Sequence, residues 1–200
     1  MKSFKKVVLT FISVALVLVP STLFAATVEV KNEEELFKAI SSDNTIILQS
    51  DVTLTKTLKI KGSNVTIDLN GNTLTVENGY IDLLKGKLEF TGKGIVKDVR
   101  VREDVTSTIW VEGSKDVNAK NYSVLTIGKD VTIDTTQWAI TVYHDDYKAY
   151  GVTLNFNGTI ESSAVNGGGI TLNGFVKNDG KIENAPVINL GKTASVKVVG

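Results

Sequence analysis

Short runs of alternating apolar and polar residues recur along this chain at nearly constant intervals. After residue 80, the runs that open each interval begin at Ile81, Ile109, Ile140, Ile170 and Ile188, which are 28, 31, 30 and 18 residues apart. Glycines divide each interval into two or three segments with the period of two that is typical of strands. One such unit cannot bury its own apolar face, so the repeat predicts strands that pair with their counterparts one unit later.

The segment VTIDLNGNTL, residues 65–74, carries the same pattern. Its first run ends at Leu69 and the alternation resumes at Leu74, with the tripeptide NGN at residues 70–72 between them. An Asn-Gly pair between two such runs usually forms an antiparallel hairpin. Because the counterpart of each run lies one repeat later, we predict instead a corner between two sheets, where Asn and Gly tolerate the left-handed backbone conformation.

These patterns predict an all-β fold, a right-handed parallel β-helix solenoid with a short N-terminal capping helix, over residues 26–200. The phrases VTIDLNGNTL, LTIGKDVTI and LNFNGTI, with the helix before NTIILQSDVTL, resemble right-handed parallel β-helix proteins, the architecture of pectin and pectate lyases. The closest resemblance is to secreted β-helix domains of bacterial surface proteins, and it implies an architecture rather than a function. A β-sandwich or an antiparallel barrel is the alternative, because short spaced strands fit both.

The predicted interior holds the apolar residues of successive repeats: Ile67, Leu69, Ile81, Leu83, Leu88, Ile109, Val111, Ile127, Ile140, Val142, Leu154, Ile170, Leu172, Ile188 and Leu190. Residues 27–50 form the predicted N-terminal cap, in which Asn32 caps a helix from Glu33 to Ile40 with acids in its first turn. The other end, INLGKTASVKVVG, has no comparable cap. We therefore expect either a fragment of a longer protein or an end covered by another chain, which would permit end-to-end self-association.

The first 25 residues have the features of a secretory signal peptide. Three lysines lie within the first six residues, an apolar run covers residues 7–19, and small residues follow at Ala25 and Ala26. The apolar run is too short for a comfortable transmembrane helix. We therefore expect a secreted or cell-surface protein, with no stable membrane span once residues 1–25 have been removed.

The charge and the cysteine content exclude several classes of function. The chain has 22 basic and 22 acidic residues, and loss of the three signal lysines leaves 19 basic residues and a net charge near −3. No basic run remains, so the sequence predicts no nucleic-acid partner. Cysteine is absent, which excludes a thiol nucleophile, a cysteine metal site and stabilisation by disulfides.

Two repeats carry insertions at the same place, SKDVNAKNYS at residues 114–123 and HDDYKAYG at residues 144–151. Insertions at equivalent places emerge on one side, about 4.8 Å apart per strand, so we predict that they form a ridge and that this ridge binds ligand. The predicted ligand-binding residues are Tyr122, Tyr143, His144, Asp145, Asp146, Tyr147 and Tyr150.

Two chemistries fit this ridge. Tyrosine rings can stack on sugars, and Asp145 and Asp146 can join backbone carbonyls around calcium, the one cofactor that the sequence suggests. The alternative is a solvated loop whose tyrosines lie against the wall, because the loop lacks the regular oxygen spacing of a dedicated calcium motif. Trp110, Trp138 and Tyr80 also lie beside alternating segments. They form either an outer carbohydrate platform or aromatic stacking within the wall.

The two arginines, Arg100 and Arg102 in KDVRVRED, are the catalytic alternative. A pectate lyase takes a proton next to a substrate carboxylate with a basic residue and calcium-binding aspartates, and the resemblance directs that role to these arginines. Both arginines alternate with valines and point the same way, so a polar strand face with ion pairs to Asp98 and Glu103 explains them as well. The outward carboxylates fall in different strand classes and do not make the acid pair of a glycosidase: Asp68, Asp82 and Asp134.

The sequence thus predicts a structural or adhesive module that presents the ridge to a glycan or to a surface protein. The alternative is a polysaccharide lyase or glycoside hydrolase acting on acidic polysaccharides. The two hypotheses differ in whether Arg100, Arg102 and nearby carboxylates converge in one groove.

Overall fold

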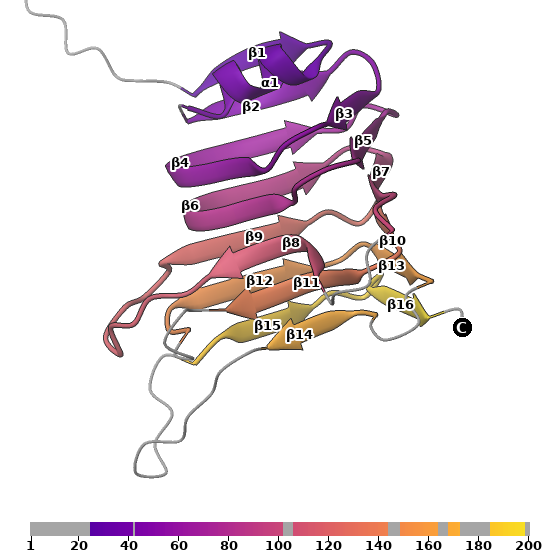
Figure 1. The fold of residues 1–200 in the computed structure, drawn as a ribbon. Coiled ribbons are helices and arrows are strands. Elements are labelled where there is room, and N and C mark those ends of the chain that lie inside the picture. The colour runs from indigo at the N-terminus through magenta and orange to yellow at the C-terminus, as the bar shows by residue number, and fades with distance from the viewer. Residues whose placement is uncertain are drawn as a thin grey trace, which may run out of the picture.

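The structure, a computed structural model (Figure 1), describes residues 25–41, 43–101, 106–143, 149–163, 168–172 and 185–198. It is mostly β, with two sheets whose named strands all pair in parallel. The prediction of an all-β protein is confirmed, and the antiparallel alternatives are wrong. Among the described residues, no helix has the length and apolarity needed to cross a bilayer.

The larger sheet has ten strands. Its path runs β1-β2-β4-β6-β8-β11-β14, and the second half of β6 also pairs with β9, which leads on to β12 and β15. The strands of this sheet are β1 (Ala26–Val30), β2 (Asn44–Leu48), β4 (Leu58–Asp68), β6 (Ile81–Thr91), β8 (Ser107–Glu112), β9 (Ser123–Ile127), β11 (Trp138–Tyr143), β12 (Val152–Phe156), β14 (Ile170–Leu172) and β15 (Val187–Leu190).

The smaller sheet has six strands in the order β16-β13-β10-β7-β5-β3. Figure 1 shows its strands lying beside the larger sheet, and both sheets run from the indigo N-terminal strands to the yellow C-terminal ones. The strands of this sheet are β3 (Val52–Leu54), β5 (Thr73–Val76), β7 (Gly94–Asp98), β10 (Val131–Thr135), β13 (Thr159–Ser162) and β16 (Ser195–Val198).

The segment at residues 70–72 is a corner between the sheets. β4 belongs to the larger sheet and β5 to the smaller one, and Asn70 and Gly71 have φ angles of 48° and 85°. The side-chain amides of Asn70 and Asn72 donate to the carbonyl of Leu48, at 3.1 and 2.8 Å. The predicted corner is therefore confirmed, and the local Asn-Gly signal for a hairpin is overridden by pairing one repeat away.

The helix α1 (Glu33–Ala39) lies at the end formed by β1 and β2 (Figure 1). The Asn32 side chain accepts the N–H of Glu35 at 2.9 Å, as predicted for a helix cap. Leu36 and Ile40 are buried, so the helix covers the apolar interior at this end. The predicted helix and its Asn32 cap are confirmed, and the helix ends one residue earlier than expected.

Aligned residues of neighbouring strands form columns, and the repeat predicts most of them correctly. Ile81, Ile109, Ile140 and Ile170 are successive partners in one column. Ile188 instead pairs with Leu154 in β12, so its assignment as the start of a repeat is wrong. Its spacing of 18 residues already differed from the others, because β15 is the later segment of the unit that β14 opens.

The interior prediction is correct for the central strands and wrong at the last ones. Eleven of the fifteen predicted residues are buried, from Ile67 to Leu154, whereas Ile170 and Ile188 are only partly buried. Leu172 and Leu190 are exposed, at 39% and 67%. In the described part of the chain, β14 and β15 pair along one edge only, so no further strand covers these two side chains.

Candidate functional site

The first insertion lies beside residues 149–151, the described part of the second one, as the ridge prediction requires. Ser114 and Tyr150 form an isolated antiparallel bridge, with N–H···O distances of 2.9 and 2.8 Å. The Tyr122 N–H donates to the Gly151 carbonyl at 2.7 Å. At Gly113, a Cβ atom would lie 2.4 Å from the Cα of Ala149, so the two segments approach too closely for a side chain there.

Four of the predicted ligand-binding residues, His144, Asp145, Asp146 and Tyr147, lie outside the described residues. Among the residues that are described, no group of three His, Asp or Glu side chains is arranged to hold a metal ion. Calcium binding by Asp145 and Asp146 stays a prediction.

An aromatic cluster stands beside the ridge, formed by Tyr80, Trp110 and Tyr143. Trp110 and Tyr143 meet edge to face with ring centroids 5.0 Å apart, and Tyr80 is tilted against Trp110 at 6.1 Å. Tyr143 is the last residue of β11, and its carbonyl accepts the N–H of Gly113 at 2.8 Å. The cluster and the start of both insertions are therefore physically continuous. Trp138, the other tryptophan considered, belongs to neither ring pair.

Asp82 lies against this cluster, whereas the sequence identified it only as an outward carboxylate and did not place it beside the aromatic residues. It is aligned with Trp110 on one side and with Lys59 on the other. It is only 3% exposed, and its carboxylate accepts a hydrogen bond from the Tyr143 hydroxyl at 3.3 Å. One feature of the sequence could have indicated it: Asp82 directly follows Ile81, the first residue of a repeat, and therefore takes an outward position.

Burial raises the pKa of Asp82 above its ordinary value, while the Tyr143 hydrogen bond and the charge of Lys59 oppose the rise. Burial and the negative charge of Asp82 also raise the pKa of Tyr143. Tyr143 therefore stays protonated as a hydrogen-bond donor at physiological pH. A carboxylate held in an apolar aromatic setting is a recognised mark of a functional site, because the arrangement costs stability.

The indole N–H of Trp110 is buried and has no hydrogen-bond partner among the described residues. Such a donor usually finds a partner in water or ligand. The cluster thus presents aromatic faces, with the Asp82 carboxylate and the Trp110 N–H buried behind them. Aromatic faces recognise a sugar ring through its apolar C–H faces.

Replacing Asp82 by asparagine should stabilise the protein at pH 7 by about 1 kcal/mol. The folded state holds the Asp82 proton more tightly than the unfolded state, so this residue lowers stability as pH rises through its raised pKa. The advantage of Asp82→Asn should therefore shrink as pH falls through the raised pKa of Asp82, and it should be lost below the ordinary aspartate pKa. Urea unfolding at neutral and acidic pH measures both values. A variant less stable than the wild type at pH 7 would show that Lys59 compensates the buried charge.

Arg100 is buried, so its assignment to a polar strand face is wrong, although the ion pair with Asp98 that was predicted for it is present. Its side chain is 3% exposed and that of Asp98 is 0% exposed, whereas Val101 is 97% exposed. The guanidinium Nε donates to Asp98 Oδ1 at 2.9 Å, and Nη2 donates to the Ser107 carbonyl at 2.8 Å. Nη1 donates to the Gly79 carbonyl.

The network around Asp98 extends across neighbouring strands. Thr108 donates to Asp98 at 2.9 Å and shares a hydrogen bond of 2.7 Å with Thr135. The Arg100 carbonyl accepts the Thr136 hydroxyl at 2.6 Å. These contacts support a structural role for Arg100. Arg102 lies outside the described residues, and the lyase alternative stays a prediction.

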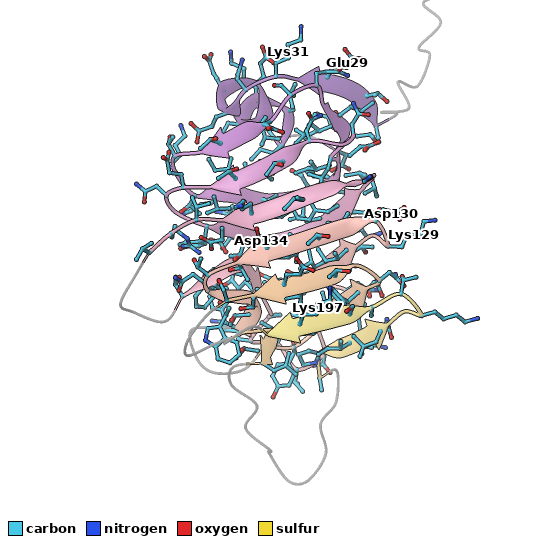
Figure 2. All side chains as sticks on the ribbon, turned by 90° about the vertical axis from the view of Figure 1, so that its right-hand side faces the viewer. Glu29, Lys31, Lys129, Asp130, Asp134 and Lys197 are labelled. Atoms are coloured by element: carbon cyan, nitrogen blue, oxygen red, sulfur yellow. The ribbon has the colours of Figure 1, made fainter. Side chains whose placement is uncertain are left out.

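The outer face of the smaller sheet carries paired charges (Figure 2). Lys97 and Asp134 are 3.3 Å apart, and Lys197 and Glu161 are 3.0 Å apart. Each pair lies on adjacent strands in register. Because the two charges of each pair neutralise one another, this face is a weaker candidate for a binding site than the aromatic cluster.

Comparison of the chain with known protein families, with curated proteins and with solved structures gives no match. Function must therefore be inferred from the chemistry of the sites themselves.

Proposed function

We propose that this chain is an exported, right-handed parallel β-helix module of the pectin- and pectate-lyase-like type. The parallel pairing of strands with their counterparts one unit later supports this architecture. Successive strands also alternate between the sheets, as β4, β5, β6 and β7 do. The signal-peptide features of residues 1–25 support export to the outside of the cell.

The proposed role is structural and adhesive, with glycan binding at the ridge and the adjoining aromatic cluster. One observation carries this proposal: Tyr80, Trp110 and Tyr143 gather around the buried carboxylate of Asp82 beside the paired insertions. Aromatic faces supply apolar contact with pyranose rings, and the buried Asp82 carboxylate holds the Tyr143 hydroxyl in place behind them. Asp145 and Asp146 remain the proposed calcium ligands.

Replacing Trp110 by alanine should weaken glycan binding at least tenfold, the loss expected when a central aromatic anchor is removed. Residues 26–200 would first be screened on a glycan array with and without calcium, and the affinity for the best glycan would then be measured by calorimetry. Trp138→Ala is the matched control, because Trp138 belongs to neither ring pair of the cluster.

Equal losses in the Trp110 and Trp138 variants, with both folded by circular dichroism, would refute the assignment of the site. Loss of binding after calcium removal would support Asp145 and Asp146 as ligands. Release of unsaturated products from acidic polysaccharides in the same assay would overturn the adhesive function in favour of a lyase.

A further inference from the structure

The first half of β4 has one edge without a strand partner among the described residues. β6 pairs with β4 along the whole of this half, but β2 pairs with β4 only at Thr66, at Ile67 and at Asp68. The Leu58 N–H donates toward β6, to the Tyr80 carbonyl at 2.9 Å. Because adjacent residues of a strand direct their backbone groups to opposite edges, the N–H of Lys59 faces the open edge.

This open edge borders a groove of ≈ 460 Å³ beneath α1. Phe37 and Ile40 line it on the helix side, and Thr57, Lys59 and Lys61 line it on the strand side. The groove is within the size range of ordinary ligand sites. The groove therefore lies between Phe37 and Ile40 on one side and, on the other, a strand edge that has no strand partner among the described residues.

The charge around the groove is positive. Lys59 and Lys61 are exposed, and Lys56 lies 4.5 Å from the centroid of the Phe37 ring. In the described part of the chain, none of these lysines forms an ion pair with a carboxylate, and no Asp or Glu lines the groove. Lys59 is in register with Asp82 and its charge acts on the pKa of that residue, but no described carboxylate lines the groove itself, so the groove favours an anionic occupant.

Carboxylates already bind backbone N–H groups on both sides of this stretch. Glu33 accepts the Thr55 N–H at 2.7 Å, and Asp43 accepts the Asn64 N–H at 2.7 Å. The Asn64 contacts lower the pKa of Asp43, which is therefore ionised at neutral pH. Among the described residues, carboxylates are therefore already bound to backbone N–H groups before and after the stretch from Lys59 to Lys61, but not within it.

We propose that the open edge of β4 binds an extended, acidic segment of a partner protein as an added strand. Backbone hydrogen bonds to the edge give affinity, and acidic side chains opposite Lys59 and Lys61 give specificity. Apolar side chains on alternate positions cover the part of Phe37 that is exposed in the groove. This partner is distinct from the glycan proposed for the aromatic cluster.

The same lysines exclude other strands. A second copy of this chain would bring Lys59 and Lys61 opposite their own counterparts, and like charges in that position are destabilising. Lysines on an edge strand also prevent pairing with uncharged apolar strands. An acidic strand is the occupant that the edge accepts.

The test uses a short, end-blocked peptide in which Glu and Val alternate, titrated calorimetrically against residues 26–200. Replacing Lys56, Lys59 and Lys61 together by glutamine should weaken binding about tenfold. The matched control replaces three exposed lysines on other segments, which removes the same charge: Lys93, Lys129 and Lys192. That control should stay within about twofold of the wild type.

Amide hydrogen exchange identifies strand pairing directly. In the peptide complex, exchange at the Lys59 N–H should slow about tenfold or more, because it gains a backbone acceptor. Equal losses in the two lysine triples, binding without slower exchange at Lys59, or no binding by the wild type would each overturn the proposal. A polyuronate that competes for the groove without protecting Lys59 would assign it to anionic polymers instead.

Discussion

Replacing Arg100 by methionine should lower the free energy of unfolding by about 3–5 kcal/mol. The substitution keeps much of the apolar bulk but leaves the Asp98 carboxylate, which is fully buried, without its cation. Removing one partner of a buried pair is costly because the remaining charge cannot return to water. Urea unfolding followed by circular dichroism measures the effect.

Two comparisons make this measurement specific. Lys97→Met removes one partner of an exposed ion pair, next to Asp98 in the chain, and should cost less than about 1 kcal/mol. Adding Asp98→Asn to Arg100→Met should recover part of the loss, because it removes the unpaired charge. If Arg100→Met were no more destabilising than Lys97→Met, the buried network would not have the role assigned to it.

Replacing Phe90 by alanine should cost about 3–5 kcal/mol. Phe90 is fully buried in a column that runs through Ile67 on one side and through Ile127 and Phe156 on the other. Neighbours held in two ladders cannot relax freely into the space that the ring leaves, so a cavity remains. Equilibrium urea unfolding checks the loss.

Leu190 is the matched control for Phe90, because it continues the same column but is 67% exposed. Leu190→Ala should change the free energy of unfolding by no more than about 0.5 kcal/mol. A loss at Leu190 comparable with that at Phe90 would mean that the last strands are covered in solution by something else.

The sequence predicts those parts of the fold in which local pattern and pairing agree. The corner at Asn70 and Gly71, the Asn32 cap and the column from Ile81 to Ile170 all follow from period, spacing and turn chemistry. The predicted burial of Leu172 and Leu190 is wrong. The alternation indicates which way a side chain points, but burial also needs a further strand that covers the side chain. The alternation of apolar and polar residues does not show which strands pair with a neighbour on both edges.

The candidate sites divide in the same way. The contact between the insertions at Ser114 and Tyr150 follows from equivalent positions in the repeat. The burial and hydrogen bonding of Asp82 depend on residues from other strands, among them Tyr143, which lies 61 residues later. The open edge of β4 depends on where β2 stops pairing, which no local pattern encodes.

In the segment around Arg100, the charged residue is buried and a neighbouring apolar residue is exposed, the reverse of the usual arrangement. Val101, an apolar residue, faces solvent, and the arginine turns inward because Asp98 is already there. Alternation predicts only that Arg100 and Val101 point in opposite directions. Which of them is buried is decided by a partner on the interior side.

The polar column of the smaller sheet has a consequence for how the chain finds its native pairing. Leu54 and Val76 are followed in register by Asp98, Thr135 and Ser162, all buried. Apolar columns look alike from one unit to the next, so a strand could dock one unit away at little cost. Misplaced in that way, Asp98 would meet Leu54 without its hydroxyl partners, at a cost of several kcal/mol. The buried charge thus favours the native strand pairing over pairings that are shifted by one repeat. It makes one segment of a repetitive sequence different from the others.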